Sequence, residues 1–349
     1  MKRIRARGEE IRQFILDQVE AHPADIAKLA AAKFQISRQA INKHLQRLTK
    51  EGCLKVAGKT RNRSYQLAPL SVWHRQYDMA PAPQDDIVWS NDIRPRLGSL
   101  PDNVMNIWQT VFTEMFNNAV EHSGGRRITV RLQRTAASTE MDIFDDGVGI
   151  FAKIRDAFDL PDEHHAVLEL SKGKLTTDPK NHSGEGIFFS SRMVDFFVIA
   201  AGQVFFSHQF GQAEDHIPEL GRRGKPGTLV SMTLGNHSSR TARQIYDQYT
   251  SGDDVGFTKT VVPVTLARYG SDALVSRSQA KRVLARVDQF KVVVFDFAGV
   301  ESIGQAFADE LFRVFPQQHP EIGYQTINTS PEVQSMIARA RAGLQESTP

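Results

Sequence analysis

Residues 107–123 read IWQTVFTEMFNNAVEHS, and this stretch decides how the middle of the chain folds. Its apolar residues recur every three or four positions, which predicts an amphipathic helix. Glu114 stands four residues before Asn118, so a carboxylate and an amide lie one turn apart on the same edge of that helix. An asparagine oxygen can ligate Mg²⁺, and a nearby carboxylate can orient or deprotonate a nucleophile. The pair therefore favours metal–nucleotide chemistry.

Two glycine-rich turns follow, at residues 141–150 (MDIFDDGVGI) and at residues 181–189 (NHSGEGIFF). The first ends a short alternating strand. Its glycines let the backbone approach a flat base or a phosphate, and Asp145 can accept a hydrogen bond from an exocyclic amine. The second turn opens a helix, whose first backbone N–H groups are a natural seat for phosphate oxygens. Each turn alone is common, so the inference depends on their order and spacing.

In this order the three motifs resemble the GHKL superfamily, whose fold is shared by DNA gyrase B subunits, heat-shock chaperones and bacterial histidine kinases. The resemblance spans about residues 85–236 and implies a pocket for ATP and Mg²⁺. It implies Glu114 as the general base or water-positioning residue, Asn118 as the Mg²⁺ ligand and Asp145 as the adenine reader. It further implies that Gly147 and Gly149 shape the adenine side, that Gly184 and Gly186 shape the phosphate side, and that Thr228 supports Asp145 from a neighbouring strand.

The same family carries a mobile ATP lid between its second and third motifs, which corresponds here to the polar segment from Arg155 to Lys180. On this interpretation Lys174, together with Lys172, meets phosphate when the lid closes; the alternative is that these lysines are solvated. Phe188 stands where the family often has a glycine, which predicts weaker phosphate binding or hydrolysis. No phosphoacceptor-histidine helix pair precedes the pocket, which argues against an ordinary sensor histidine kinase.

The first 70 residues are basic, with 15 lysines and arginines against 6 aspartates and glutamates, whereas the whole chain carries a net charge of +3. This asymmetry predicts a polyanion partner for the first segment, the alternative being a solvated basic surface. Apolar spacing predicts helices over residues 8–20, 24–33 and 38–50, with Ser37 as the N-cap of the third. A hairpin over residues 54–67 follows. Three helices and a hairpin predict a winged helix-turn-helix.

In that fold the third helix enters the major groove of DNA while a basic wing contacts phosphate. Residues 36–45 (ISRQAINKHL) are similar to the start of the recognition helix in bacterial helix-turn-helix repressors. The alternative is a winged helix that binds protein. The residues expected to contact DNA are Arg38, Gln39, Asn42, Lys43, Gln46 and Arg47 on the helix, and Lys59, Arg61 and Arg63 on the wing.

Prolines between residues 69 and 86 predict a linker over residues 71–86, which would separate a domain of residues 1–70 from one of residues 87–236. From residue 250 to residue 345 strands alternate with helices. The stretch VVVFDFAGV (292–300) leading into SIGQAFA (302–308) resembles STAS-like domains, relatives of anti-anti-sigma factors. In those proteins a GHKL kinase phosphorylates a serine in the turn. Gln305 or Ala306 occupies that position here and Ser302 comes a few residues early, so docking or dimerisation is expected instead.

The predicted fold class is multidomain α+β: a winged helix, then a GHKL α/β sandwich whose mixed sheet is covered by helices on one face, then a small α/β STAS-like domain. The sequence contains no apolar run of membrane-spanning length, and its basic N-terminus leads into amphipathic sequence. Cys53 is the only cysteine, which excludes an intrachain disulfide. We therefore expect a cytoplasmic protein without membrane contact.

The functional hypothesis is a DNA-binding regulator in which Mg-ATP binding, with slow hydrolysis, controls DNA or partner engagement. Helix-turn-helix proteins are commonly dimers, so a homodimer is expected. Two alternatives stay open: a partner-switching protein serine kinase that acts on a STAS-like domain, and a non-catalytic DNA-bound scaffold. Whether the chain is an enzyme, either an ATPase or a kinase, is left open at this point.

Overall fold

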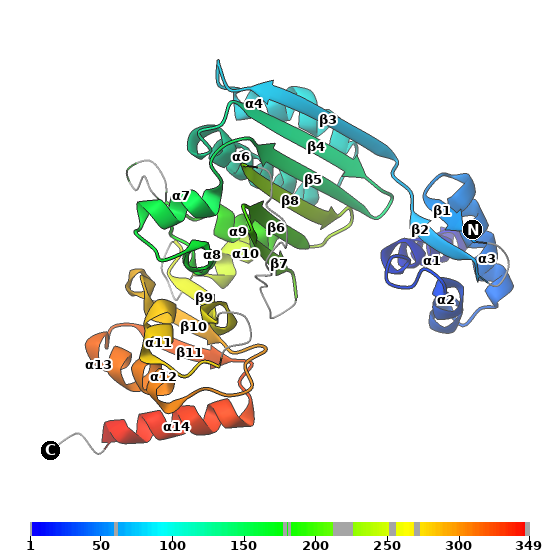
Figure 1. The fold of residues 1–349 in the computed structure, drawn as a ribbon. Coiled ribbons are helices and arrows are strands. Elements are labelled where there is room, and N and C mark those ends of the chain that lie inside the picture. Colours follow the sequence, from blue (N-terminus) through cyan, green and yellow to red (C-terminus); the bar gives the residue numbers. More distant parts are fainter. Residues whose placement is uncertain are drawn as a thin grey trace.

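The helices and strands of the chain form three groups along the sequence (Figure 1). The computed structural model describes residues 2–58, 62–176, 180, 183–211, 226–250, 256–268 and 273–345. Within these ranges no helix is both long enough and apolar enough to cross a membrane. The protein is a multidomain α+β chain.

The N-terminal group consists of three helices and a hairpin, in the order that the sequence predicts. The helices are α1 (Lys2–Gln18), α2 (Ile26–Phe34) and α3 (Arg38–Lys50), and β1 (Leu54–Ala57) pairs antiparallel with β2 (Ser64–Leu67). The third helix begins after Ser37, whose Oγ accepts a hydrogen bond of 3.2 Å from the Ala40 N–H. Ile41 and Leu45 of this helix are fully buried in a core of their own group.

The central group is built on a six-stranded sheet in the order β3-β4-β5-β8-β6-β7. All five pairings between these strands are antiparallel, where the sequence had predicted a mixed sheet. Residues of β4 and β5 alternate between buried and half-buried, because only one face of the sheet is covered by helices (Figure 1). The strands are β3 (Ser71–Asp78), β4 (Arg127–Arg134), β5 (Ser138–Asp145), β6 (Phe196–Ala201), β7 (Val204–Gln209) and β8 (Thr228–Gly235).

The edge strand β3 corrects the predicted linker of residues 71–86. Eight residues of this segment pair with β4, from Ser71 opposite Arg134 to Asp78 opposite Arg127. Most of its side chains are exposed, so the strand lacks the alternation by which a half-buried strand is recognised. The prolines that suggested a linker lie outside the paired residues.

The first helices of the central group are a short helical stretch and a long helix that covers the sheet. Residues 85–97 run continuously through α4 (Asp85–Val88), the π-helical turn η2 (Trp89–Ile93) and α5 (Arg94–Leu97), and α6 (Asp102–His122) follows. Trp108, Phe112 and Phe116 of α6 are buried in the core, where the last two rings stack with centroids 5.1 Å apart and Phe116 also packs against Tyr77 of β3. This packing leaves the opposite edge of α6 for Glu114 and Asn118.

The segment predicted to be a polar lid is largely helical and partly buried. It contains the end of α7 (Ile150–Ala157) and the whole of α8 (Glu163–Lys172), and residues 166–172 are all buried. The expected polar, exposed character is wrong for residues 166–172, since Glu169, Ser171 and Lys172 are charged or polar by sequence but buried. That the segment acts as a lid stays a prediction. The third motif opens α9 (Gly186–Met193), and α10 (Ala242–Gln248) follows β8 in the chain.

The C-terminal group is a small parallel sheet in the order β11-β10-β9 with helices around it. Its strands are β9 (Lys259–Pro263), β10 (Val292–Asp296) and β11 (Gly323–Ile327). Helix α11 (Arg277–Leu284) precedes β10, and α12 (Gln305–Asp309), η5 (Glu310–Val314) and α13 (Phe315–Gln318) follow it as one helical stretch. The last helix is α14 (Pro331–Gln345), and short 3-10 turns form η3 (Val264–Ala267) and η4 (Val287–Gln289).

Candidate functional site

A cavity of about 340 Å³ lies where the three sequence motifs meet. Ligand pockets for small molecules span roughly 300–1,000 Å³, so the cavity is of a suitable size. Side chains from α6, β5, α7, α8, α9 and β8 surround it. The residues that line it are Glu114, Met115, Asn118, Ala119, His122, Ser123, Ile143, Asp145, Ile150, Lys153, Ile154, Phe158, Leu170, Leu175, Thr176, Ser183, Gly184, Gly186, Ile187, Thr228 and Val230.

One wall of the cavity is the edge of α6. Glu114, Asn118 and His122 succeed each other at four-residue spacing and all three line the cavity. Met115 and Phe116, on the neighbouring face of the helix, are buried in the core and fix its rotation. The helix therefore presents a carboxylate, an amide and an imidazole along one side of the cavity.

Asp145 lies on the opposite side, at the end of β5. Its buried Oδ1 accepts hydrogen bonds from the backbone N–H of Gly147, at 2.9 Å, and of Thr228, at 3.3 Å. Burial raises the pKa of this carboxyl above its ordinary value, while the two backbone donors act in the opposite direction. A carboxylate offers about four acceptor positions, so these two bonds leave it able to accept from a ligand.

The glycines of the second motif shape this side without lining the cavity themselves. Gly147 supplies a hydrogen bond to Asp145, and Gly149 precedes the first residue of α7 with a φ of 89°. The Thr228 hydroxyl in turn accepts a 3.0 Å hydrogen bond from the Ile150 N–H. Thr228 thus joins β8 both to Asp145 and to the start of α7.

The third motif meets α6 at Gly186. A Cβ atom on Gly186 would lie 2.0 Å from Glu114 Oε2, so glycine lets the start of α9 approach this carboxylate without displacing it. Gly184 and Ser183 also line the cavity. Asn181 and His182 of the same motif lie outside the described residues.

Several residues at or near the cavity were not singled out from the sequence, and three of them carry chemistry. Lys153 lines it, and its ammonium donates a 2.8 Å hydrogen bond to the His122 carbonyl. Phe158 supplies an aromatic face. Burial raises the pKa of Tyr246, and the Glu114 and Glu185 carboxylates add to this rise, which places the Tyr246 hydroxyl within their field. Only Lys153 had a detectable signal, since it stands one turn after Gly149 on the helix that the motif opens.

The structure does not bring the two lid lysines to the cavity, and the expectation that they meet phosphate when the lid closes stays a prediction. Lys174 Nζ donates to the Gln289 carbonyl at 3.0 Å and lies 4.9 Å from the centre of the Phe290 ring. Burial lowers its pKa. Lys172 is 1% exposed and forms an ion pair with Glu169. Both lysines contact the C-terminal group instead.

The residues expected to contact DNA form one exposed surface on α3. Ile41, Leu45 and Leu48 are buried on the other face of this helix. Arg47 donates a 2.7 Å hydrogen bond to Glu51, which leaves its charge partly neutralised. Lys59 and Arg61 of the expected wing lie outside the described residues, while Arg63 is exposed. The exposed side chains are Arg38, Gln39, Asn42, Lys43, Gln46 and Arg47.

Comparison with known proteins bears on the C-terminal group. Residues 279–334 match the family model described as a STAS-like domain of unknown function (DUF4325). The match runs from α11 into α14 and confirms the STAS-like resemblance for this part of the chain. No curated protein matches the sequence. The chain therefore carries a STAS-like domain at its C-terminal end.

Proposed function

We propose that the chain is a DNA-binding regulator whose central domain binds Mg-ATP. In this proposal residues 1–70 form a winged helix-turn-helix, the central group is a GHKL-type nucleotide-binding domain, and the STAS-like domain engages a protein partner or a second copy of the chain. The observation that carries the proposal is the meeting of the three motifs around one cavity, since Glu114, Asn118, Asp145, Gly184, Gly186 and Thr228 all line it.

The side chains of the cavity suit a nucleotide. The adenine amine would donate to Asp145, whose carboxylate is held by Gly147 and Thr228. Ile150, Ile154 and Phe158 supply the apolar and aromatic surface that a purine ring requires. The phosphates would face the backbone at the start of α9, where N–H groups are available.

The donor set at Asn118 also fits Mg²⁺. In the described part of the chain no group of three or more His, Cys, Asp and Glu side chains could hold a metal ion. Mg²⁺ keeps several waters and is usually held by one or two protein oxygens together with substrate phosphates, so the Asn118 amide oxygen suffices for the protein's share. The bound ion would neutralise phosphate charge, and Glu114 would orient or deprotonate a water on the same edge of α6.

The basic face of α3 supports the DNA-binding part of the proposal. Its exposed arginine, lysine, asparagine and glutamine side chains are those that pair with base edges and phosphates. The N-terminal group also contacts the central one, because Ala136 and Ala137 of the β4–β5 turn pack against its core. A conformational change in the central domain is therefore expected to reach α3 through the contact of Ala136 and Ala137 with the N-terminal core.

The proposal is tested by measuring the affinity of the full chain for labelled duplex DNA with and without Mg-ATP. A change of at least threefold that is lost when Asp145 is replaced by asparagine supports the regulator. Labelled ATP distinguishes the alternatives: label on Ser302 or another protein residue favours the serine kinase, and label in free phosphate favours an ATPase switch. An equal affinity for DNA with and without Mg-ATP, together with no detectable ATP binding, favours the scaffold.

A further inference from the structure

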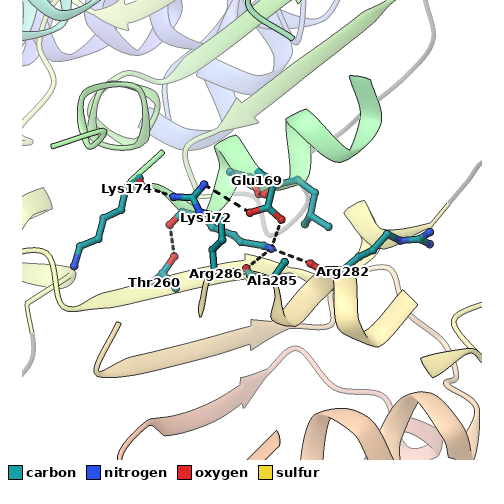
Figure 2. A network of polar contacts seen from close by, with 9 residues as sticks. Glu169, Lys172, Lys174, Thr260, Arg282, Ala285 and Arg286 are labelled. Atoms are coloured by element: carbon teal, nitrogen blue, oxygen red, sulfur yellow. Dashed lines mark hydrogen bonds and ion pairs between the residues drawn. The ribbon is translucent and has the colours of Figure 1, made fainter. Parts of the chain in front are cut away.

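The STAS-like domain is attached to the wall of the candidate nucleotide cavity through a buried lysine. Lys172, the last residue of α8, is 1% exposed, and its Nζ lies 2.7 Å from Oε1 of the buried Glu169 (Figure 2). The same ammonium donates hydrogen bonds to the carbonyls of Arg282, at 2.9 Å, and of Ala285, at 2.8 Å. The Ala285 carbonyl lies just after the last residue of α11, where backbone oxygens lack a partner within the helix, and the Arg282 carbonyl also accepts a bond of 3.4 Å from the Ala285 N–H. Lys172 therefore caps a helix of the STAS-like domain, and its charge matches the negative end of that helix.

The backbone carbonyls of Lys172 and Lys174 are bonded to the same domain. The Thr260 hydroxyl donates to the Lys172 carbonyl at 2.6 Å, and Arg286 donates to the Lys174 carbonyl at 2.6 Å (Figure 2). Gly173 lies between these bonds with a φ of 82°, and a Cβ atom there would lie 2.5 Å from the Phe257 ring. Only glycine permits this approach. Backbone and side chains of residues 172–174 are thus fixed against β9, α11 and the turn that follows α11.

These contacts reach the cavity directly. Leu170, Leu175 and Thr176, on either side of the held residues, all line it. The Leu175 N–H donates to the Gly184 carbonyl at 3.2 Å, which joins the held segment to the third motif. The Arg286 guanidinium lies 5.0 Å from the centre of the Phe158 ring, and Phe158 also lines the cavity.

The helix on the phosphate side has its own connection to the STAS-like domain. Phe188 of α9 packs against Phe257 with ring centroids 4.4 Å apart, and Phe257 packs against Phe290 at 5.1 Å. This aromatic cluster explains the phenylalanine at a position where a glycine was expected. Two of the cavity walls, residues 170–176 and α9, therefore contact the same domain.

The interface also contains one ion pair, Arg286–Glu169, that is longer than a hydrogen bond. Glu169 Oε2 and Arg286 Nη1 are both buried, and among the described residues neither has a hydrogen-bond partner. They face each other at 3.8 Å, whereas a charge-assisted hydrogen bond measures about 2.7–2.9 Å. A shift of α8 toward the STAS-like domain of about 1 Å would complete this bond.

We infer that Lys172 positions the cavity wall and makes the STAS-like domain part of the nucleotide-binding unit, so that filling the cavity alters the STAS-like domain. Lys172 is a positioning residue, because it acts through residues 170–176 and lines no part of the cavity itself. By linkage, a ligand that binds the STAS-like domain in the same arrangement would change nucleotide affinity by the same factor. The inference rests on the proposed function only in naming ATP as the ligand. The attachment of the STAS-like domain to the cavity wall does not depend on it.

The test is hydrogen–deuterium exchange on the full chain, without ligand and with saturating Mg-ATP, beside calorimetry of ATP binding. In wild type, Mg-ATP is expected to slow amide exchange in residues 282–290 at least threefold. In Lys172→Met this protection is expected to vanish, exchange without ligand to rise in both residues 163–176 and 282–290, and the ATP Kd to rise about tenfold. Lys281→Met, which removes an exposed lysine of α11 outside the network, is the matched control and should behave as wild type.

The double variant Glu169→Met/Lys172→Met separates positioning from folding, because it removes both members of the buried Lys172–Glu169 ion pair together and such replacements are commonly tolerated. It should keep a wild-type melting curve and still lose the protection of residues 282–290. Equal exchange and equal ATP affinity in wild type and Lys172→Met would overturn the inference. If wild type does not bind ATP, the proposed function fails, and the attachment is then decided by the exchange measured without ligand: a joint rise in both segments supports it, and an unchanged rate refutes it.

Discussion

The backbone N–H of Thr228 donates a hydrogen bond to Asp145 Oδ1, although the two residues stand 83 positions apart in the sequence. They face each other in register across β5 and β8. This pairing fixes the orientation of a buried carboxylate at the end of a strand, beside the edge of α6 that carries Glu114 and Asn118. The candidate site is therefore assembled by the register of the sheet.

Replacement of Asp145 by asparagine should not destabilise the protein in the absence of ligand at pH 7.5. Burial raises the pKa of this carboxyl above the value of 3.8 that it has when unfolded, so its favourable contribution is complete below pH 3.8 and is lost as the pH rises through the folded pKa. Asparagine cannot ionise and still offers an Oδ1 acceptor to Gly147 and Thr228. Urea unfolding followed by circular dichroism should show Asp145→Asn at least as stable as wild type at pH 7.5.

The difference between the two proteins should shrink as the pH approaches 4. Asp142→Asn is the control, because Asp142 lies on the other face of β5 and forms an ion pair of 2.8 Å with Arg131. Since the substitution removes this ion pair, it should not raise the free energy of unfolding. A wild type more stable than Asp145→Asn by over about 1 kcal/mol at pH 7.5 would contradict the assigned direction of the pKa shift.

Glu114→Gln should separate catalysis from binding. General base catalysis contributes about 10²–10⁴-fold to rate, so turnover of labelled ATP should fall at least 100-fold. The ATP Kd should stay within about threefold of wild type, since glutamine fills the same space beside Gly186. Glu121→Gln, on the same helix but outside the cavity lining, should retain wild-type turnover. Unchanged turnover in Glu114→Gln would remove Glu114 from the catalytic role.

Lys43→Ala should reduce the salt dependence of DNA binding. A lysine that neutralises one phosphate adds about 0.9 to the slope of log K against log salt concentration, so the variant should lose about that much. The measurement is fluorescence anisotropy of a labelled duplex over a series of salt concentrations. Lys28→Ala removes another exposed lysine, from α2, and should keep the wild-type slope. Equal slopes in all three proteins would argue that α3 does not bind DNA.

Much of the architecture could be predicted because its signals are local. The bounds of α3 agree with the prediction, since Ser37 caps the helix and Ile41, Leu45 and Leu48 mark its buried face. Strand β10 was found from its run of valines. Strand β3 was missed because an edge strand with exposed side chains carries no alternation.

The residues of the candidate site that belong to sequence motifs could be predicted, and those brought to it by tertiary packing could not. Glu114, Asn118 and Asp145 could be singled out because each belongs to a short pattern with a chemical meaning. Lys172 could not be placed, because its partners are carbonyls 110 and 113 residues further along the chain. The sequence alone does not distinguish a buried lysine from a solvated one. Phe158 was missed for the same reason, since only tertiary packing brings it to the cavity.

The most direct test of the central claim is calorimetry of Mg-ATP binding to wild type and to Asp145→Asn. We expect wild type to bind and the variant to lose at least 50-fold in affinity with its unfolding curve intact. The amide oxygen of the variant would stay bonded to Gly147 and Thr228, and its NH₂ group, which can only donate, would then face the donating adenine amine. Equal binding by both proteins, or no binding by wild type, would contradict the assignment of this cavity as an ATP site.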